Sequence, residues 1–81
     1  MTYDIVFKPR ALKDLKSLPK SVRQRIVEKI EALRTDRAGD VKRLTDFTPE
    51  YRLRVGDYRV LFEVEENKVV VYRVVNRKDA Y

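Results

Sequence analysis

The segment YRLRVGDYRVLFEV, residues 51–64, carries the pattern that most restricts the fold of this chain. Apolar and polar residues alternate on both sides of Gly56-Asp57, and such a pair between alternating segments is typical of a two-residue β-hairpin turn. The predicted register gives one apolar face made of three cross-strand pairs: Val55 with Tyr58, Leu53 with Val60, and Tyr51 with Phe62. The opposite face then carries Arg52, Arg54 and Arg59, with Arg54 directly across from Arg59.

A third strand follows, and its register depends on the length of the second loop. A two-residue loop at Glu66-Asn67 would place Arg73 on the apolar face, where an unpaired guanidinium is costly. A three-residue loop over Glu65–Asn67 keeps Arg73 on the face of Arg59 and uses Asn67 in the left-handed conformation, which Asn tolerates well. We therefore predict the three-residue loop, with these residues in the core: Val70, Tyr72 and Val74.

The N-terminal half predicts one strand and two helices. Alternation over residues 3–7 indicates a short strand. Pro9 is suited to the first turn of a helix and Pro19 ends that helix. Ser21 and Gln24 have the spacing of a capping box for a second helix. The helices are expected to pack through apolar stripes formed by these residues: Ala11, Leu12, Leu15 and Leu18 in the first, and Val22, Ile26, Val27, Ile30 and Leu33 in the second.

These elements predict an α+β fold, βααβββ, in which a helical hairpin covers one face of a mostly antiparallel sheet. The other face would present five arginines: Arg52, Arg54, Arg59, Arg73 and Arg77. Guanidinium groups so close together repel one another unless a ligand supplies negative charge, and their planar donors match phosphate oxygens in pairs. The expected ligand is therefore a polyanion or an acidic protein, although a solvated basic face is the simpler alternative.

The composition limits the kinds of catalytic and metal-binding site that the chain could form. The chain has a formal net charge of +6, with no histidine and no cysteine, so the commonest general base, thiolate metal sites and disulfides are excluded. No carboxylate cluster has metal-binding spacing, and neither a metal nor another cofactor is expected. The N-terminal residues lack the apolar stretch of a signal peptide, and no membrane-spanning segment is found. We expect a cytoplasmic protein without a membrane partner.

RNA cleavage is a reaction that such a face could support. The 2′-hydroxyl of RNA is the nucleophile, so the protein needs to orient it, accept its proton and stabilise the charge on phosphorus. Proton acceptors are scarce. Tyr81 follows Arg77 by four residues, and neighbouring guanidiniums would favour its phenolate, but it is also explained as a frayed end residue. Glu50 and Glu63 are the other candidates, and both are more simply explained as surface carboxylates.

Three stretches resemble the RelE branch of the RelE/ParE toxin superfamily: FKPRALKDLKSLP, YRLRVGDYRVLFEV and KVVVYRVVNRKDAY. The resemblance covers the chain in order and length and implies one RelE-like toxin domain over residues 1–81. It implies a metal-independent endoribonuclease (an mRNA interferase) that enters the ribosomal A site and cuts mRNA there. It also implies an acidic, co-expressed antitoxin that wraps around the toxin, giving a toxin–antitoxin hetero-oligomer.

The resemblance assigns catalytic roles to three residues. Arg59 matches the arginine that braces the scissile phosphate, Arg77 the arginine that stabilises or protonates the leaving group, and Tyr81 the tyrosine that orients or deprotonates the 2′-hydroxyl. Arg52 and Arg54 stand where many relatives carry lysines, and arginine cannot practically lose its proton. This departure implies a slower enzyme or greater dependence on Tyr81. Further contacts to mRNA or ribosomal RNA are expected from these residues: Arg73, Lys42, Arg43 and Lys78.

Two other functions stay open at this point. ParE toxins share the fold and inhibit DNA gyrase, although they usually have a longer helical hairpin and lack the Arg/Arg/Tyr set. A non-catalytic RNA-binding module would use the same basic face, because function depends on the site and not on the shared fold.

Overall fold

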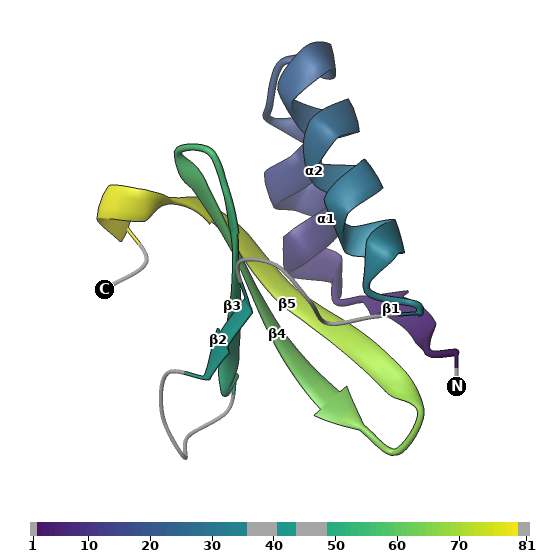
Figure 1. The fold of residues 1–81 in the computed structure, drawn as a ribbon. Coiled ribbons are helices and arrows are strands. Elements are labelled where there is room, and N and C mark those ends of the chain that lie inside the picture. The colour runs from purple at the N-terminus through teal and green to yellow at the C-terminus, as the bar shows by residue number, and fades with distance from the viewer. Residues whose placement is uncertain (1, 36–40, 44–48, 80–81) are drawn as a thin grey trace.

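The computed structural model of the 81-residue chain describes residues 2–35, 41–43 and 49–79 (Figure 1). It confirms the predicted α+β class. The elements in chain order are β1 (Asp4–Phe7), α1 (Pro9–Lys16), α2 (Lys20–Ala32), β2 (Val41–Arg43), β3 (Tyr51–Val55), β4 (Tyr58–Glu65), β5 (Lys68–Asn76) and the short 3₁₀ helix η1 (Arg77–Asp79).

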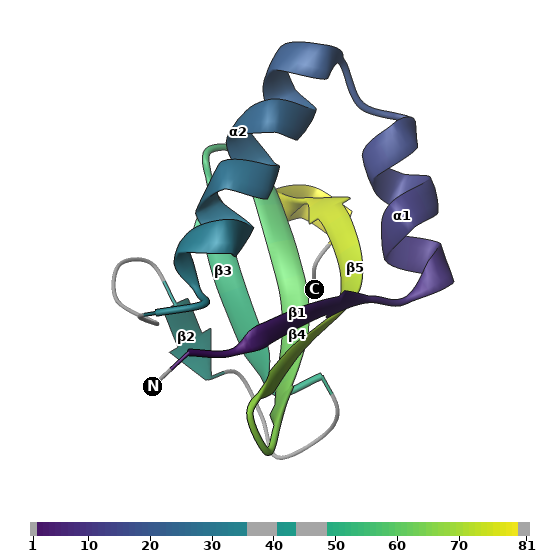
Figure 2. The same cartoon turned by 90° about the vertical axis from the view of Figure 1, so that its right-hand side faces the viewer.

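The strands in the described residues form one sheet in the order β1-β5-β4-β3-β2. β1 runs parallel to β5, and the other neighbouring strands are antiparallel. Both helices lie on the same side of the sheet, with α2 in front of β3 and β4 and α1 beside β5 (Figure 2). The sequence analysis missed the edge strand β2, because a strand of three residues is too short to show alternation.

The two prolines fix where the helices begin. Pro9 is the first residue of α1, where its missing N–H has no intrahelical partner to lose. Pro19 has extended backbone angles and occupies the N-cap of α2, so this helix begins at Lys20. The predicted capping box is wrong, because Ser21 lies inside the first turn and the N-cap has no side-chain hydrogen bond.

The first hairpin is confirmed in every pair. Val55 faces Tyr58, and the register continues to Tyr51 and Phe62, whose rings stack with centroids 5.5 Å apart. Gly56 has φ of +58°, in the left-handed region that glycine adopts without a steric penalty. The apolar face of this hairpin lies under α2, where Phe62, Ile26 and Ile30 are fully buried.

The predicted second loop is wrong. Glu65 pairs with Lys68, so the turn contains two residues, and Glu66 has the positive φ, 55°, that was expected of Asn67. This register alone would direct Arg73 to the apolar face. It does not do so, because the pairing of β4 with β5 shifts further along the hairpin.

The shift makes Tyr72 the extra residue of a β-bulge in β5. Phe62 pairs with Val71 and Leu61 pairs with Arg73, so the side chains after Tyr72 exchange faces relative to those before it. The valines that enter the core are therefore Val69, Val71 and Val74. The prediction holds for Val74, and Val70 is also buried at 5% exposure, although it lies opposite Glu63 and outside the main core cluster. The prediction is wrong for Tyr72, which is half-buried and lies under the Lys8 ammonium.

Asp14 attaches α1 to β5 directly after the bulge. Its Oδ2 accepts hydrogen bonds from Arg73 Nε at 2.7 Å and from the Val74 N–H at 2.9 Å, and its Oδ1 accepts a longer bond from Arg73 Nη2 at 3.3 Å. β1 pairs with β5 only up to Val71, so Val74 lies on a free stretch of strand edge. The Asp14 carboxylate supplies the acceptor that a neighbouring strand would otherwise provide.

Asp14 should make the stability of the fold depend on pH. Burial raises the pKa of the Asp14 carboxyl, but the hydrogen bonds from Arg73 and Val74 and the charges of Arg73 and Arg10 outweigh burial and lower the pKa below its usual 3.8. A carboxyl with a lowered folded-state pKa stabilises the protein above its unfolded pKa, and this contribution is lost as the pH falls through the folded pKa.

We expect Asp14→Asn to lower the free energy of unfolding by about 2 kcal/mol at pH 7, because it removes charged hydrogen bonds from a nearly buried site. The difference from the unmodified protein should shrink as the pH falls below about 4. Urea denaturation at both pH values measures it. Glu31→Gln is the control, because the Glu31–Arg34 ion pair is solvent-exposed and its loss should change little. A deficit that stays constant with pH would contradict this assignment.

Candidate nucleic-acid interface

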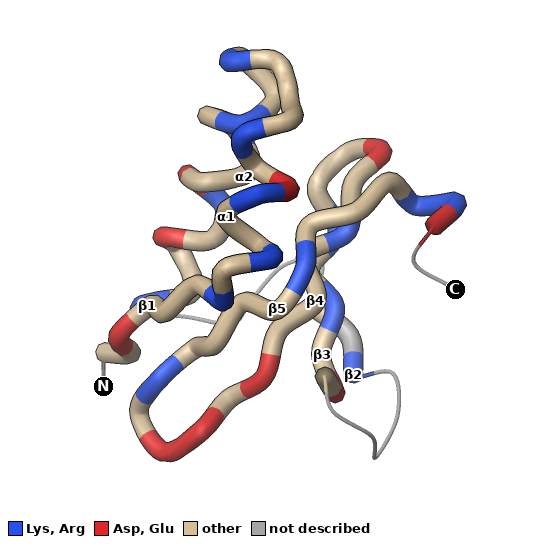
Figure 3. The backbone as a smooth tube through the Cα atoms, turned by 180° about the vertical axis from the view of Figure 1, so that it is seen from behind, with Lys and Arg blue, Asp and Glu red and all other residues tan. Residues whose placement is uncertain are grey.

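Lys and Arg, blue in Figure 3, lie on neighbouring strands of the sheet. The register directs several of them to the face turned away from the helices. Arg54 on β3 lies directly opposite Arg59 on β4, and Lys42 on β2 lies opposite Arg52 on β3. We call the surface formed by Arg52, Arg54 and Arg59 the arginine face. The alternating register of the first hairpin produces it, because residues at every second position point to the same side.

Arg59 is the central residue of the arginine face and is only 9% exposed. Its Nη1 donates to the carbonyl oxygens of Gly56 at 2.9 Å and of Tyr58 at 2.8 Å. Its Nε is buried and has no hydrogen-bond partner. Across the described residues, no carboxylate forms an ion pair with this guanidinium. The group therefore lies nearly buried beside Arg54, with no counter-charge from the described part of the chain.

The other two residues of the arginine face differ in exposure. The Arg54 side chain is exposed, and the Arg52 side chain is half-buried and has partners of its own. Both arise from β3 as predicted. Together with Arg59 they form a strip of positive charge two strands wide, which suits a ligand with several anionic groups.

Arg73 lies on the same side of the sheet by register, opposite Leu61, but its guanidinium is bound within the protein. Its Nε and Nη2 bind the Asp14 carboxylate, and the side chain of Arg73 is 38% exposed. This hydrogen bond raises the pKa of the Arg73 guanidinium, although burial acts in the opposite direction. Arg73 is therefore a structural contact to α1, and its predicted part in ligand binding stays a prediction.

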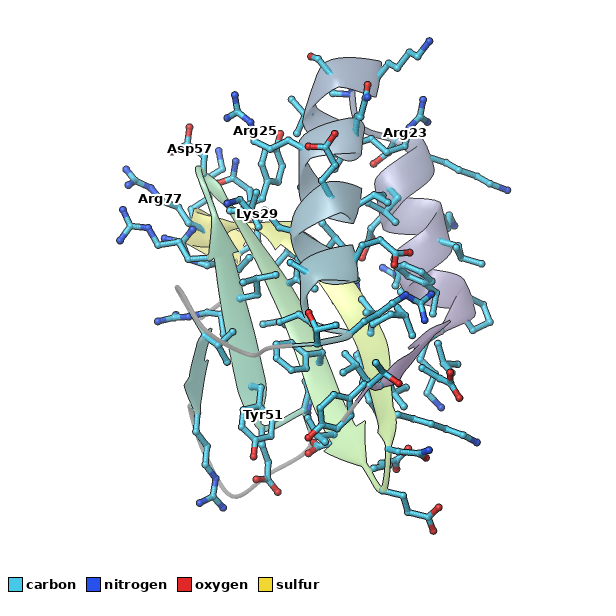
Figure 4. All side chains as sticks on the ribbon, turned by 45° about the vertical axis from the view of Figure 1, so that its right-hand side comes forward. Arg23, Arg25, Lys29, Tyr51, Asp57 and Arg77 are labelled. Carbon is cyan, nitrogen blue, oxygen red and sulfur yellow. The ribbon has the colours of Figure 1, made fainter. Side chains whose placement is uncertain are left out.

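Arg77 does not lie on a strand, because β5 ends at Asn76 and η1 begins at Arg77. The backbone N–H of Arg77 donates to the carbonyl oxygen of Asp57 at 2.8 Å, which fixes η1 to the first hairpin turn. Its side chain is exposed and points away from the helices (Figure 4). Arg77 thus lies directly after the last strand, on the side of the sheet turned away from the helices.

The other residues predicted to bind RNA or to act in catalysis differ in where they lie and in how far the structure describes them. Arg43 lies opposite Tyr51, so register directs it away from the arginine face, and its Nε donates to Glu50 Oε2 at 3.0 Å. Lys78 is exposed in η1, where its backbone N–H donates to Asn76 Oδ1 at 3.2 Å. Lys42 is described only by its backbone, and Tyr81 lies outside the described residues.

The two carboxylates considered as proton acceptors have structural partners. Glu63 is 8% exposed, and its Oε2 accepts the backbone N–H of Glu50 at 2.9 Å. The expectation that Glu63 is a solvated surface residue is wrong, because its side chain is held at the start of β3. Glu50 is in turn bound by Arg43. These contacts link the ends of β2, β3 and β4 instead of presenting a free base.

Asp14 is the residue with a clear role that the sequence analysis missed. A possible signal was its place in the sequence LKDLKS, where it is the single acidic residue of a basic helix and lies next to the buried Leu15. In the described part of the chain, no group of His, Cys, Asp and Glu could hold a metal ion, and no helix could cross a membrane.

Comparisons with known proteins agree over nearly the whole chain. A family model described as the ParE toxin of the type II toxin–antitoxin system, parDE, matches residues 5–81. The toxin RelE3 of Methanocaldococcus jannaschii is 34% identical over 82 residues, which cover 95% of this chain and 93% of that protein.

Two solved structures show the same arrangement of elements. The RelE–RelB complex of Pyrococcus horikoshii gives a TM-score of 0.81 at 30% identity, covering 99% of this chain and 100% of the matched chain. The RelB–RelE antitoxin–toxin complex of Methanococcus jannaschii gives a TM-score of 0.77 at 32% identity, covering 94% of each chain.

The different surroundings of Arg54, which is exposed, and Arg73, which is bound by Asp14, predict different effects of the same substitution. Arg54→Gln should weaken binding of a single-stranded RNA oligonucleotide, reduce the slope of log K against log salt by about 0.7, and leave stability unchanged. Arg73→Gln should lower the free energy of unfolding and change the RNA affinity less. Fluorescence anisotropy across a salt series and urea denaturation test both variants. An equal loss of RNA affinity in the two variants would place Arg73 in the interface.

Proposed function

Because the chain is a type II toxin–antitoxin toxin of the RelE/ParE family, and of its RelE branch, we propose that it is an mRNA endoribonuclease that acts on the ribosome. In this proposal it inhibits translation by cleaving mRNA through attack of the 2′-hydroxyl on the adjacent phosphate. The nucleophile belongs to the RNA, so the reaction requires neither a metal ion nor an activated water.

The observation that supports this proposal is the nearly buried guanidinium of Arg59, whose Nε has no hydrogen-bond partner among the described residues. A buried donor without a partner commonly costs about 1–3 kcal/mol, more if it is charged, and Arg59 lies in addition opposite another arginine. A residue retained only for stability would not be placed in this way. A phosphate bound at this guanidinium would supply a counter-charge. Because Nε itself is buried, a phosphate oxygen would reach it only after the side chain or its neighbours move.

The hydrogen bonds of Arg59 indicate how a phosphate would bind. Both hydrogens of Nη1 are directed to carbonyl oxygens and Nε is buried, so Nη2 is the donor left for a ligand in this conformation. The additional charge that develops on a phosphate oxygen in the pentacoordinate transition state would strengthen a hydrogen bond from this donor.

The other proposed residues complete the reaction around that phosphate. Arg77 stabilises the charge on the leaving 5′-oxygen from its exposed position in η1, and Tyr81 orients or deprotonates the 2′-hydroxyl. Arg54 and Arg52 hold neighbouring phosphates, with weaker contributions from these residues: Lys42 and Lys78. Arg43 is bound by Glu50 and Arg73 by Asp14, so neither has a part in the proposed mechanism.

Ribosome dependence follows from the shortage of bases. Arginine remains protonated throughout the physiological pH range, and the nearby carboxylates Glu50 and Glu63 are held by structural contacts. Orientation alone can contribute several kcal/mol when the reacting atoms are held in line. The ribosome would supply that orientation by holding the message in its A site, and the toxin would supply fixed positive charge.

A cognate antitoxin is the proposed protein partner. The similar archaeal structures are complexes of RelE with RelB. This chain has a net charge of +6, so an acidic antitoxin would be attracted to it and could cover the arginine face in a hetero-oligomer. The proposed site of action on the ribosome implies a cytoplasmic location.

Gyrase inhibition is the second candidate function, because the matching family model is named for ParE. A gyrase inhibitor would bind a protein and would have no need for an unpaired guanidinium on the sheet. The order in which macromolecular synthesis stops in cells separates the two functions.

Arg59→Met tests the nuclease directly. We expect the rate of cleavage of ribosome-bound mRNA to fall by about 10²–10³-fold, because one preorganised donor to the transition state is lost. Stability should remain equal or increase, because the substitution removes an unpaired buried charge. Arg10→Met on α1 removes the same charge at an exposed position away from the arginine face and should leave the rate of cleavage unchanged. Full cleavage by Arg59→Met would exclude Arg59 from the mechanism.

Induced expression without an antitoxin should stop growth by stopping translation. Incorporation of labelled methionine should collapse before incorporation of labelled thymidine. In a purified system, the protein should cleave free mRNA poorly and ribosome-bound mRNA efficiently. An earlier arrest of DNA synthesis would support gyrase inhibition, and efficient cleavage of free RNA would contradict the proposed role of the ribosome.

A further inference from the structure

The two proposed catalytic arginines are attached to the same hairpin turn. The Gly56 carbonyl accepts a hydrogen bond from the side chain of Arg59 at 2.9 Å. The carbonyl of the next residue, Asp57, accepts the backbone N–H of Arg77 at 2.8 Å. The turn therefore contacts one arginine through its guanidinium and the other through its main chain, although the two residues come from different elements.

We propose that the Gly56-Asp57 turn positions both catalytic arginines relative to the scissile phosphate, with Gly56 as the positioning residue. The inference rests on the proposed nuclease function and adds a role for residues that do not touch the substrate. Arg59 could otherwise rotate about its flexible side chain, and Arg77 lies just beyond the last strand, so neither would have a fixed position without the turn.

The direction of the turn carbonyls is what holds the Arg59 guanidinium in place. The Gly56 and Tyr58 carbonyls together occupy Nη1, which fixes the plane of the group and leaves Nη2 for the ligand, because Nε is buried. Rotation of either peptide in the turn would break this arrangement. A small displacement of a catalytic group is expected to lower the rate of reaction more than the affinity for substrate.

Glycine is required at position 56 by conformation and not by lack of space. Gly56 has φ of +58°, which L-amino acids adopt reluctantly. A Cβ built there would lie 3.9 Å from Arg25 Nη1 on α2, an ordinary van der Waals distance. Figure 4 shows Asp57 at the tip of the turn, with Arg25 on the side of α2 and Arg77 on the side away from the helices. A D-residue at position 56 would therefore favour the observed backbone, whereas an L-residue would oppose it.

The second hairpin turn offers an internal control. Glu66 also has a positive φ, 55°, and its neighbour Asn67 accepts the backbone N–H of Asp4 at 2.9 Å. This turn lies at the opposite end of β4 and contacts neither Arg59 nor Arg77. Substitutions there change a turn of similar geometry without touching the proposed positioning contacts.

The test compares three full-length proteins made by chemical synthesis: the unmodified chain, Gly56→Ala and Gly56→D-Ala. Multiple-turnover cleavage of ribosome-bound mRNA gives kcat and KM for each. We expect the L-alanine variant to lose on the order of 10–100-fold in kcat with KM unchanged. The D-alanine variant should retain the unmodified kcat, and so should the control Glu66→Ala.

A fourth protein tests the second contact without changing a side chain. Replacing the Asn76–Arg77 amide by an ester removes the N–H that binds the Asp57 carbonyl and should lower kcat while KM is kept. This variant decides the question if Gly56→Ala does not fold, as judged by circular dichroism. An unchanged kcat in Gly56→Ala or in the ester would overturn the inference. If kcat is unchanged in Gly56→Ala or in the ester while Arg59→Met loses cleavage, only the positioning role of the turn is excluded. If Arg59→Met keeps full activity, the role of Arg59 on which the proposed function rests is excluded.

Discussion

The β-bulge at Tyr72 determines which side chains reach each face of the sheet. Without it, the two-residue turn at Glu66-Asn67 would bury Arg73 in the core. With it, both halves of β5 supply valines to the core, and Arg73 and the Val74 N–H meet the Asp14 carboxylate of α1. The bulge thus couples core packing, the docking of the first helix and the separation of an apolar face from a charged one. A bulge of this kind is a functional part of a strand, not an irregularity.

Because the two faces of the sheet are separate, the arginine face can hold a residue, Arg59, that is unfavourable for stability without disturbing the core. The helices cover the apolar face, and the hydrophobic core is complete there without any contribution from the arginines. Arg59 is then free to lie nearly buried beside Arg54 with an unsatisfied Nε. Small domains have little stability in excess, so a costly residue at the centre of the sheet is most simply explained by a ligand that binds there.

Local patterns in the sequence predicted the first hairpin correctly, because alternation and a glycine turn fix its register without reference to the rest of the chain. The second hairpin was not predictable in this way. Its register depends on the bulge at Tyr72, which is decided by the packing of β1, α1 and the core. Likewise, Arg52, Arg54 and Arg59 share a face because strand geometry requires it, whereas the capture of Arg73 by Asp14 joins residues 59 positions apart that no local pattern connects. The burial of Glu63 has the same origin, in a contact to the start of another strand.

The size of the domain also accounts for the kind of chemistry proposed. A lysine or histidine base must be desolvated, or placed near other charges, before its pKa suits catalysis. In a chain of 81 residues whose helices cover one face of the sheet, the other face has little depth for such a site. Arginine needs no such adjustment, because it stays charged whether it is exposed like Arg54 or buried like Arg59. What arginine does need is a fixed direction, which hydrogen bonds to main-chain carbonyls can provide at the surface of a thin fold. A reaction that depends on oriented charge, with the nucleophile supplied by RNA and the alignment by the ribosome, is therefore one that so small a protein can carry out.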